Sequence, residues 1–101
     1  MRRAAKVDAN QAEIVDALRA VGARVECLHG VGGGVTDLLV LYRGDLFLLE
    51  IKDGAKPPSA RRLTPDQFEW HRRWANPNLH VVCTVSDALQ AIGAKIVSDP
   101  Y

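Results

Sequence analysis

The chain has 101 residues, of which 48% are hydrophobic and 25% charged, as is typical of one globular domain with a modest core. Its formal net charge of +1 gives no strongly basic surface, so any nucleic-acid binding has to come from local patches. No apolar run approaches the roughly 20 residues that span a bilayer, and the basic residues 1–7, expected to be frayed, precede no signal-peptide core. Cys27 and Cys83 stand in apolar stretches, where we expect buried, reduced thiols. We therefore expect a cytoplasmic protein with no contact to a membrane.

The first predicted element is a helix that Asp8 or Asn10 can cap and that ends near Val21, where Gly22 favours a stop. Its expected core residues recur at helical spacing and are Ile14, Ala17, Leu18 and Val21. Glu13 lies beside this stripe, and taken alone it is expected to be a solvated helix charge.

Residues 24–28 form a short predicted strand, and the glycine-rich loop 29–34 follows it. A phosphate-binding loop is excluded because no Gly-Lys-Ser/Thr sequence follows and because the next element is a strand. We expect the glycines to permit a close approach of the backbone near Asp37.

Two apolar runs, 38–42 and 46–51, predict a β-hairpin with strands too apolar to face water on both sides. If residues 43–44 form a two-residue turn, Tyr42 faces Asp45, whereas a three-residue loop would shift the register by one.

The two-residue turn places Asp37 opposite Glu50, and the pleat puts Lys52 on the same face as Glu50. Mg²⁺ is usually bound by one or two carboxylates together with water and substrate phosphate, so this convergence suits a metal site. A nearby lysine could orient or activate water and offset charge on a phosphoryl transition state. The alternative is structural: a Glu50–Lys52 ion pair at a sheet edge, with Asp37 at the start of a strand.

The segment 53–63 contains Pro57-Pro58, which is expected to exclude both a helix and a central strand. It is basic, and we expect Lys56, Arg61 and Arg62 to border the site and contact nucleic-acid phosphates.

Thr64, Pro65 and Gln67 predict a helix start, with a capping threonine, a proline at the first position and a glutamine at the third. This second helix is expected to reach about Ala75, before Asn76-Pro77.

The faces of this second helix give further candidates. Gln67 and His71 share one face, and His71 either faces the substrate or packs half-buried. Arg72 is a further candidate contact to nucleic acid. We expect Trp70 and Trp74 to be core or interface residues rather than platforms for base stacking.

Residues 79–85 are a predicted fourth strand, and Ser86-Asp87 are expected to cap a final helix that ends near Ile92. The element order αβββαβα predicts an α/β fold with a mixed four-stranded sheet flanked by helices. The segment 46–85 should be a right-handed parallel crossover.

The pattern resembles the PD-(D/E)XK nuclease superfamily, and within it the small VRR-NUC group of phage and bacterial proteins. The matching segments cover nearly the whole chain: Asn10-Gln-Ala-Glu13, Val-Thr-Asp37, Leu-Glu-Ile-Lys52-Asp-Gly, Leu-Thr-Pro-Asp-Gln67 and Trp70-His71. Thr36 departs from the proline that the family often has before the aspartate, a position that shapes the backbone and does no chemistry. The resemblance implies a restriction-endonuclease-like core spanning residues 1–101 as one nuclease domain.

The resemblance also implies Mg²⁺- or Mn²⁺-dependent hydrolysis of DNA phosphodiester bonds, with no small-molecule cofactor. Carried over by position, the metal would be held by the Asp37 and Glu50 carboxylates and the backbone carbonyl of Ile51. Lys52 would position or polarise the attacking water. Glu13 and Gln67 would support the metal or the water.

Branched DNA such as a Holliday junction is the expected substrate, because some relatives of this size cut it. A homodimer is expected to use Trp70, Trp74 or the last helix as its interface, since two-fold symmetry suits paired strands. The alternative function is a nucleic-acid-binding module without turnover. A zinc site is also conceivable, although its spacings match no common zinc signature; its ligands would be Cys27, His29, His80 and Cys83.

Overall fold

The computed structural model describes residues 8–94, so the segment 1–7 and the tail 95–101 lie outside the described residues. The elements follow in the expected order: α1 (Gln11–Ala20), β1 (Arg24–Cys27), β2 (Leu38–Tyr42), β3 (Asp45–Ile51), the short 3₁₀ helix η1 (Pro58–Arg61), α2 (Pro65–Arg73), β4 (Leu79–Val82) and α3 (Val85–Ala91). The described part of the chain is therefore an α/β fold with three α-helices and a mixed four-stranded sheet.

The sheet has the order β1-β2-β3-β4, with antiparallel pairing from β1 to β3 and parallel pairing of β3 with β4. Tyr42 pairs with Asp45, which confirms the two-residue turn. The turn residues have positive φ values of 51° at Arg43 and 84° at Gly44, as a type I′ hairpin requires. The sequence thus sets the register that places the charged residues at the end of the hairpin.

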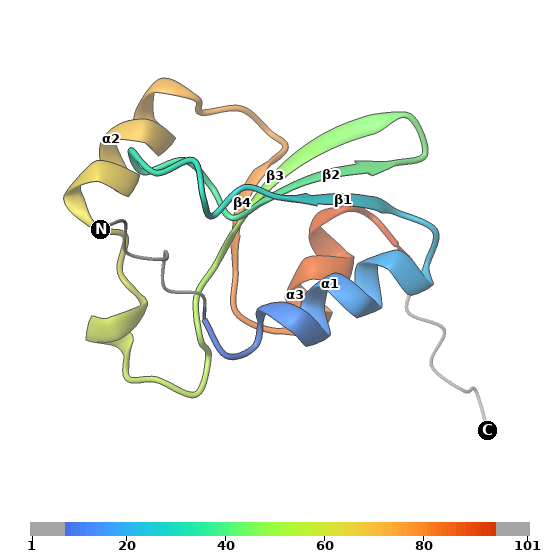
Figure 1. Cartoon of the computed structure of the whole chain (residues 1–101), viewed down its shortest axis with the longest axis horizontal. Coiled ribbons are helices and arrows are strands. Elements are labelled where there is room, and N and C mark those ends of the chain that lie inside the picture. The colour runs from blue at the N-terminus through green and yellow to red at the C-terminus, as the bar shows by residue number, and fades with distance from the viewer. Residues whose placement is uncertain (1–7, 95–101) are drawn as a thin grey trace.

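The core lies between one face of the sheet and the helices α1 and α3, which lie side by side in Figure 1. Helix α2 lies apart from them, beside the loop between β1 and β2 (Figure 1). The strands contribute Val25, Leu38, Val40, Phe47, Leu49, Ile51 and Val82 to the core, and the two helices contribute Ile14, Val15, Leu18, Ala88 and Ile92. Glu50 lies between Leu49 and Ile51, so its side chain points to the opposite face of the sheet.

Helix α1 ends at the expected glycine. Gly22 has a φ of 95°, and its N–H donates to the carbonyl of Arg19 at 3.0 Å. The next N–H, of Ala23, donates to Leu18 at 3.1 Å, which completes a Schellman motif. Of the expected core residues, Ile14 and Leu18 are buried and Val21 is half-buried, whereas the buried Val15 was not expected.

Three local expectations are wrong. β4 ends at Val82 rather than Val85, because Thr84 caps α3 in place of Ser86-Asp87: its hydroxyl accepts from the Asp87 N–H at 3.0 Å. Pro57-Pro58 does not exclude helical structure, since Pro58 begins η1, where a missing N–H costs nothing.

The third wrong expectation concerns the cysteines. Cys27 is exposed at the end of the edge strand β1, and Cys83 is half-buried; both are free thiols. No helix in residues 8–94 is long and apolar enough to cross a membrane.

Candidate functional site

The hairpin brings Asp37 next to the end of β3. Its register, continued one residue past the Leu38–Leu49 pair, puts Asp37 opposite Glu50. The backbone N–H of Ile51 donates to Oδ2 of Asp37 at 2.7 Å, which fixes that carboxyl group against the strand. The structure thus places these two acids together as the sequence predicts.

Glu50 is a buried carboxyl group with an altered acidity. Glu50 is 2% exposed, and this burial is the main reason that its pKa rises from 4.5 to about 9. The Asp37 carboxyl raises the pKa further, through a hydrogen bond that favours the protonated form and through Coulombic repulsion, while Lys52 opposes the shift. Burial and the Asp37 carboxyl therefore outweigh the attraction of Lys52, whose Nζ lies 3.9 Å from Glu50.

Lys52 is also buried, with 8% of its surface exposed. Its Nζ donates to Oε1 of Gln67 at 2.7 Å and lies 3.9 Å from Oε2 of Glu50. Its backbone is held as well, because the Asn10 amide donates to the carbonyls of Lys52 at 3.2 Å and Cys83 at 2.8 Å. Asn10 precedes α1 but makes no side-chain cap, so its structural role differs from the expected one.

Gln67 connects α2 to the two buried charges. Its Oε1 accepts from the backbone N–H of Thr64 at 2.9 Å, and Thr64 Oγ1 accepts from the Gln67 N–H at 3.2 Å, so both halves of the predicted capping box are present. With Oε1 engaged in this way, Nε2 donates to Oε2 of Glu50 at 3.1 Å.

The glycine-rich loop supports this helix start. Gly34 has a φ of 85°, and a Cβ atom there would overlap the Asp66 carbonyl group and lie 2.8 Å from the Gln67 nitrogen. The close approach predicted near Asp37 is made by Gly34, three residues earlier, to the first turn of α2. Gly33 also has a positive φ, of 67°, and a Cβ there would meet nothing within 4 Å.

His71 reaches the same site from the next turn of α2. Its Nε2 lies 4.0 Å from Oε1 of Glu50, and its side chain is 12% exposed. Burial, and then the charge of Lys52, lower the pKa of His71, so the imidazole is neutral at neutral pH. Among residues 8–94, neither His71 Nε2 nor Glu50 Oε1 has a hydrogen-bond partner.

Glu13 is not brought into this group. It is exposed on α1, lines a pocket with Asn10 and Asp53, and makes no hydrogen bond or ion pair with Asp37 or Glu50 among the described residues.

The sequence predicts only a helix-capping role for Asp8. Its charge raises the pKa of Glu50, and its Oδ1 lies 3.6 Å from Nζ of Lys56. An acidic residue just before α1 was the available signal, but its distance from β3 could not be known from the sequence.

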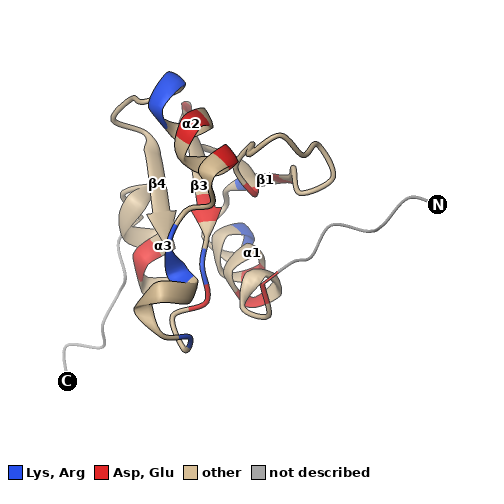
Figure 2. Ribbon diagram, turned by 90° about the vertical axis from the view of Figure 1, so that its left-hand side faces the viewer, with Lys and Arg blue, Asp and Glu red and all other residues tan. Residues whose placement is uncertain are grey.

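The basic candidates have different surroundings. Lys56 is exposed, and its Nζ lies 3.6 Å from the Asp8 carboxylate, whose charge reaches Glu50. Arg62 is exposed and Arg61 is half-buried, while Arg72 is exposed and hydrogen-bonds Glu69 one turn earlier. Figure 2 shows basic residues at the C-terminal end of α2 and acidic residues on α2 and at the end of β3.

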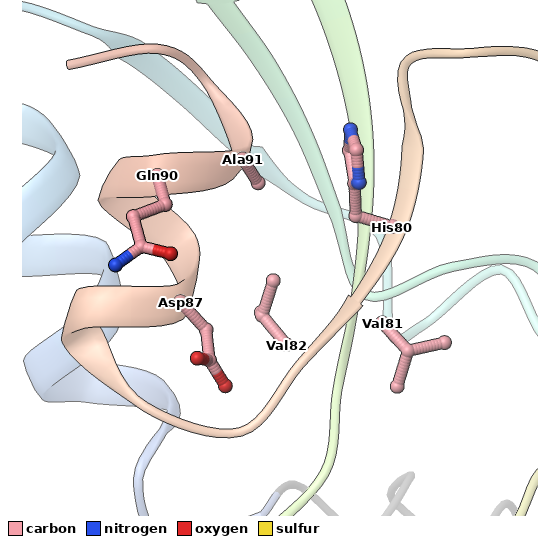
Figure 3. Close-up of a pocket in the computed structure, with 6 residues that line it drawn as sticks. All are labelled: His80, Val81, Val82, Asp87, Gln90 and Ala91. Atoms are coloured by element: carbon pink, nitrogen blue, oxygen red, sulfur yellow. The ribbon is translucent and has the colours of Figure 1, made fainter.

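The structure excludes the zinc alternative within its described part. No group of three or more His, Cys, Asp or Glu side chains in residues 8–94 is placed to hold a metal ion. Cys27 and His29 line one pocket and Cys83 another. His80 lines a third pocket of about 380 Å³ between β4 and α3, shown in Figure 3, which contains none of the candidate catalytic residues.

The residues at the hairpin end nevertheless fit a hard dication. Mg²⁺ needs only one or two carboxylates and keeps several waters, so the Asp37–Glu50 pair and the Ile51 carbonyl suffice without a cluster of three acidic or imidazole groups. The unpartnered Oε1 of Glu50 is the observation that favours a ligand here. Two carboxyl groups that share a proton can share a cation instead.

Comparisons of the chain with protein-family models, curated proteins and solved structures found no match.

Proposed function

We propose that this chain is a metal-dependent endonuclease that hydrolyses DNA phosphodiester bonds, built on a restriction-endonuclease-like core. The resemblance of its motifs to the VRR-NUC group supports the proposal. The observation that carries it is the convergence of two carboxyl groups and an ammonium at the end of β3: Glu50 is 2% exposed, lies opposite Asp37 and has Lys52 Nζ 3.9 Å away. Buried carboxyl pairs of this kind need a proton or a cation, and they occur more often at functional sites than elsewhere.

The proposed roles follow from the contacts. Asp37, Glu50 and the Ile51 carbonyl would hold Mg²⁺ or Mn²⁺, which when bound supplies positive charge that stabilises the phosphoryl transition state and activates water. Lys52 orients the attacking water and adds a second positive charge. Gln67 holds both Lys52 and Glu50, so it positions the two groups relative to each other. Glu13 bonds neither Asp37 nor Glu50 among the described residues, so its support of the metal or the water stays a prediction.

The test is incubation of the purified chain with linear, nicked, flap and four-way DNA, with Mg²⁺, with Mn²⁺ and with a chelator. We expect cleavage only with a metal, and more of it on branched DNA, with Asp37→Asn inactive as the matched control. Binding of DNA without cleavage under every condition would instead support the non-catalytic module.

The proposed homodimer needs a revised interface. Trp70 is 8% exposed and stacks on Trp74 at 5.2 Å, so only Trp74 presents its ring to solvent. Large exposed apolar side chains occur on the sheet and on α2, namely Leu41, Leu46, Val81, Phe68 and Trp74. Light scattering at micromolar concentration, with and without DNA, should give the mass of two chains; the mass of one chain in both conditions would contradict the dimer.

A further inference from the structure

The face of the sheet that bears Glu50 is apolar beyond the candidate site. Side chains alternate along a strand, so every second residue of β3 before Glu50 shares its face, and the strand register gives the neighbours on β2 and β4. The apolar residues of this surface, here called the leucine face, are Leu39, Leu41, Leu46, Leu48, Leu79 and Val81. All of them are half-buried or exposed, and Leu46 is the most exposed at 57%.

The leucine face lacks the cover that its composition requires. Helices α1 and α3 pack on the opposite face of the sheet (Figure 1), and α2 contacts this one at Glu50, through Gln67 and His71. Antiparallel strands that expose one face to water normally carry polar residues there, whereas the outward residues of β2 are both leucines. An exposed apolar surface of this kind marks an interaction site.

The leucine face is arranged in two rows across the sheet, each with a charged residue of β1 at one end and leucines beyond it. The first row is Arg24, Leu41 and Leu46, and the second is Glu26, Leu39, Leu48 and Leu79. Arg24 and Glu26 are exposed, and neither forms an ion pair within residues 8–94. The two rows therefore present opposite charges at the same edge of the sheet.

A half-turn about an axis that lies between the two rows exchanges them. A second copy placed by this rotation faces the first with its strands reversed, as two sheets that pack about 10 Å apart. Leucines of one copy then meet leucines of the other, and Arg24 of each copy meets Glu26 of the other. A two-fold interface requires such a self-complementary surface, so the arrangement of the charges favours a second copy of this chain as the occupant.

We propose that the leucine face is the interface of a homodimer, in which two copies pack sheet against sheet and Arg24 of each copy pairs with Glu26 of the other. The inference rests on the homodimer proposed above and names the surface that forms it. The exposed apolar side chains of α2, Phe68 and Trp74, are not part of this interface. Glu50 follows Leu48 by two residues on β3, so the interface borders the candidate site of each copy.

The first experiment measures the mass of the full chain without DNA by sedimentation velocity, from about 1 to about 100 µM. Wild type should have the mass of two chains. Leu46→Glu places a charge in the centre of the interface and should have the mass of one chain. Phe68→Glu is the matched control, because Phe68 is 61% exposed but lies on α2, and it should keep the mass of two chains. Both residues are exposed in the single chain, so neither substitution disturbs the core.

The second experiment exchanges the charges. Arg24→Glu brings acids against acids and Glu26→Arg brings cations against cations, so each variant alone should raise the Kd of the dimer at least about tenfold. The two variants complement each other, so their equimolar mixture should form a heterodimer with a Kd within about threefold of wild type. A general defect in folding would give no such rescue.

A monomeric wild type, a dimer that persists in Leu46→Glu, or a mixture no tighter than its two components overturns the inference. Cleavage is not measured in either experiment, so the proposed nuclease fails or stands separately. A dimer with these properties that cuts no DNA refutes the nuclease and leaves the interface standing. A monomer that cuts DNA does the reverse.

Discussion

The ammonium of Lys52 donates a 2.7 Å hydrogen bond to Oε1 of Gln67, and the same oxygen accepts from the backbone N–H of Thr64. One side-chain atom therefore closes the first turn of α2 and holds a buried charge of the candidate site. Because Gln67 also donates to Glu50, formation of the helix cap and assembly of the site depend on the same residue. This relationship makes Gln67 the natural first test.

Replacing Gln67 by alanine should lower the free energy of unfolding by about 1 to 3 kcal/mol, because it removes the side-chain half of the capping box and leaves Glu50 and Lys52 with fewer partners. Urea unfolding measures the change. The matched control is Gln90→Ala in α3, an exposed glutamine that bonds only Ser86 at 3.4 Å, and it should cost less than about 0.5 kcal/mol. Equal effects of the two substitutions would show that the network adds no stability.

The sequence predicts the hairpin and the opposition of its acids because local chemistry determines both. A positive φ is favourable at Gly44 and tolerable at the turn residue Arg43, so the turn type follows from two positions. Strand alternation then fixes which residues share a face with Glu50. The capping box of α2 is equally local, since Thr64 and Gln67 lie within one turn.

Local sequence patterns do not determine the distances between elements, and the expectations that depended on such distances are the ones that could not be made correctly. Helical spacing shows that Glu13 flanks the buried stripe of α1, but not how far the helix stands from β3. The same holds for Asp8, whose charge reaches Glu50, and for Gly34, which touches the start of α2. Trp70 and Trp74 are both tryptophans and lie one helical turn apart, yet Trp70 is buried and Trp74 is exposed.

Gly34→Ala should displace the start of α2 and weaken the contacts of Gln67. A Cβ at Gly34 would overlap the Asp66 carbonyl, a backbone group that cannot turn aside. Gly33→Ala is the control, because its φ of 67° imposes similar backbone strain while its Cβ would meet open space. We expect a cost of about 1 kcal/mol for Gly33→Ala and at least about 2 kcal/mol more for Gly34→Ala, measured by urea unfolding. Equal losses of the free energy of unfolding in the two variants would show that the contact of Gly34 with Asp66 does not affect the stability of α2.

Metal-free protein should lose stability as the pH rises from 7 to 9. The Glu50 carboxyl has a pKa of about 9 when folded and 4.5 in its ordinary state, so between these values the folded state binds more protons than the unfolded state. Linkage then lowers the free energy of unfolding by up to about 1.4 kcal/mol per pH unit. His71 acts in the opposite direction, because its lowered pKa makes stability rise with pH, but only below about pH 6.5.

Thermal melting of wild type and Glu50→Gln in a chelating buffer measures this pH effect. The variant should melt at nearly constant temperature across that range, and saturating metal should likewise flatten the wild-type profile because it replaces the proton. A wild-type melting temperature that stays level or rises between pH 7 and 9 would contradict a raised pKa of Glu50.

Arg61 and Arg62 precede α2 in the chain, and under the proposed function we expect them to contact the phosphates of bound DNA. Each neutralised phosphate contributes about 0.9 to the slope of log affinity against log salt concentration, so Arg61→Ala with Arg62→Ala should reduce that slope by about 1.8. Arg19→Ala is the control, because this arginine lies on α1, on the core side of the sheet. Fluorescence anisotropy over a salt series measures both, and an unchanged slope in the double variant would place this segment away from DNA.

The final prediction separates the roles of the buried charges through substitutions that keep side-chain shape. Asp37→Asn retains an oxygen for the N–H of Ile51, and Glu50→Gln retains one for Gln67. Each replaces one member of a carboxyl pair that cannot fully ionise by a neutral amide, so metal-free stability should stay level or rise. A neutral amide is a poor ligand for a hard dication, so both variants should lose metal-induced stabilisation and cleavage.

Lys52→Met should behave differently, because it keeps the buried aliphatic stem but removes the ammonium next to two carboxyl groups. Metal should still raise the melting temperature, since Asp37 and Glu50 remain, whereas cleavage should fall by at least about a hundredfold with one positive charge lost from the transition state. Melting with and without Mn²⁺, paired with cleavage of four-way DNA, measures both properties on the same samples. If the site were only a structural ion pair, all three variants would be less stable and none would respond to metal. A wild type without metal-induced stabilisation, together with normal cleavage by Lys52→Met, would remove these residues from the active site.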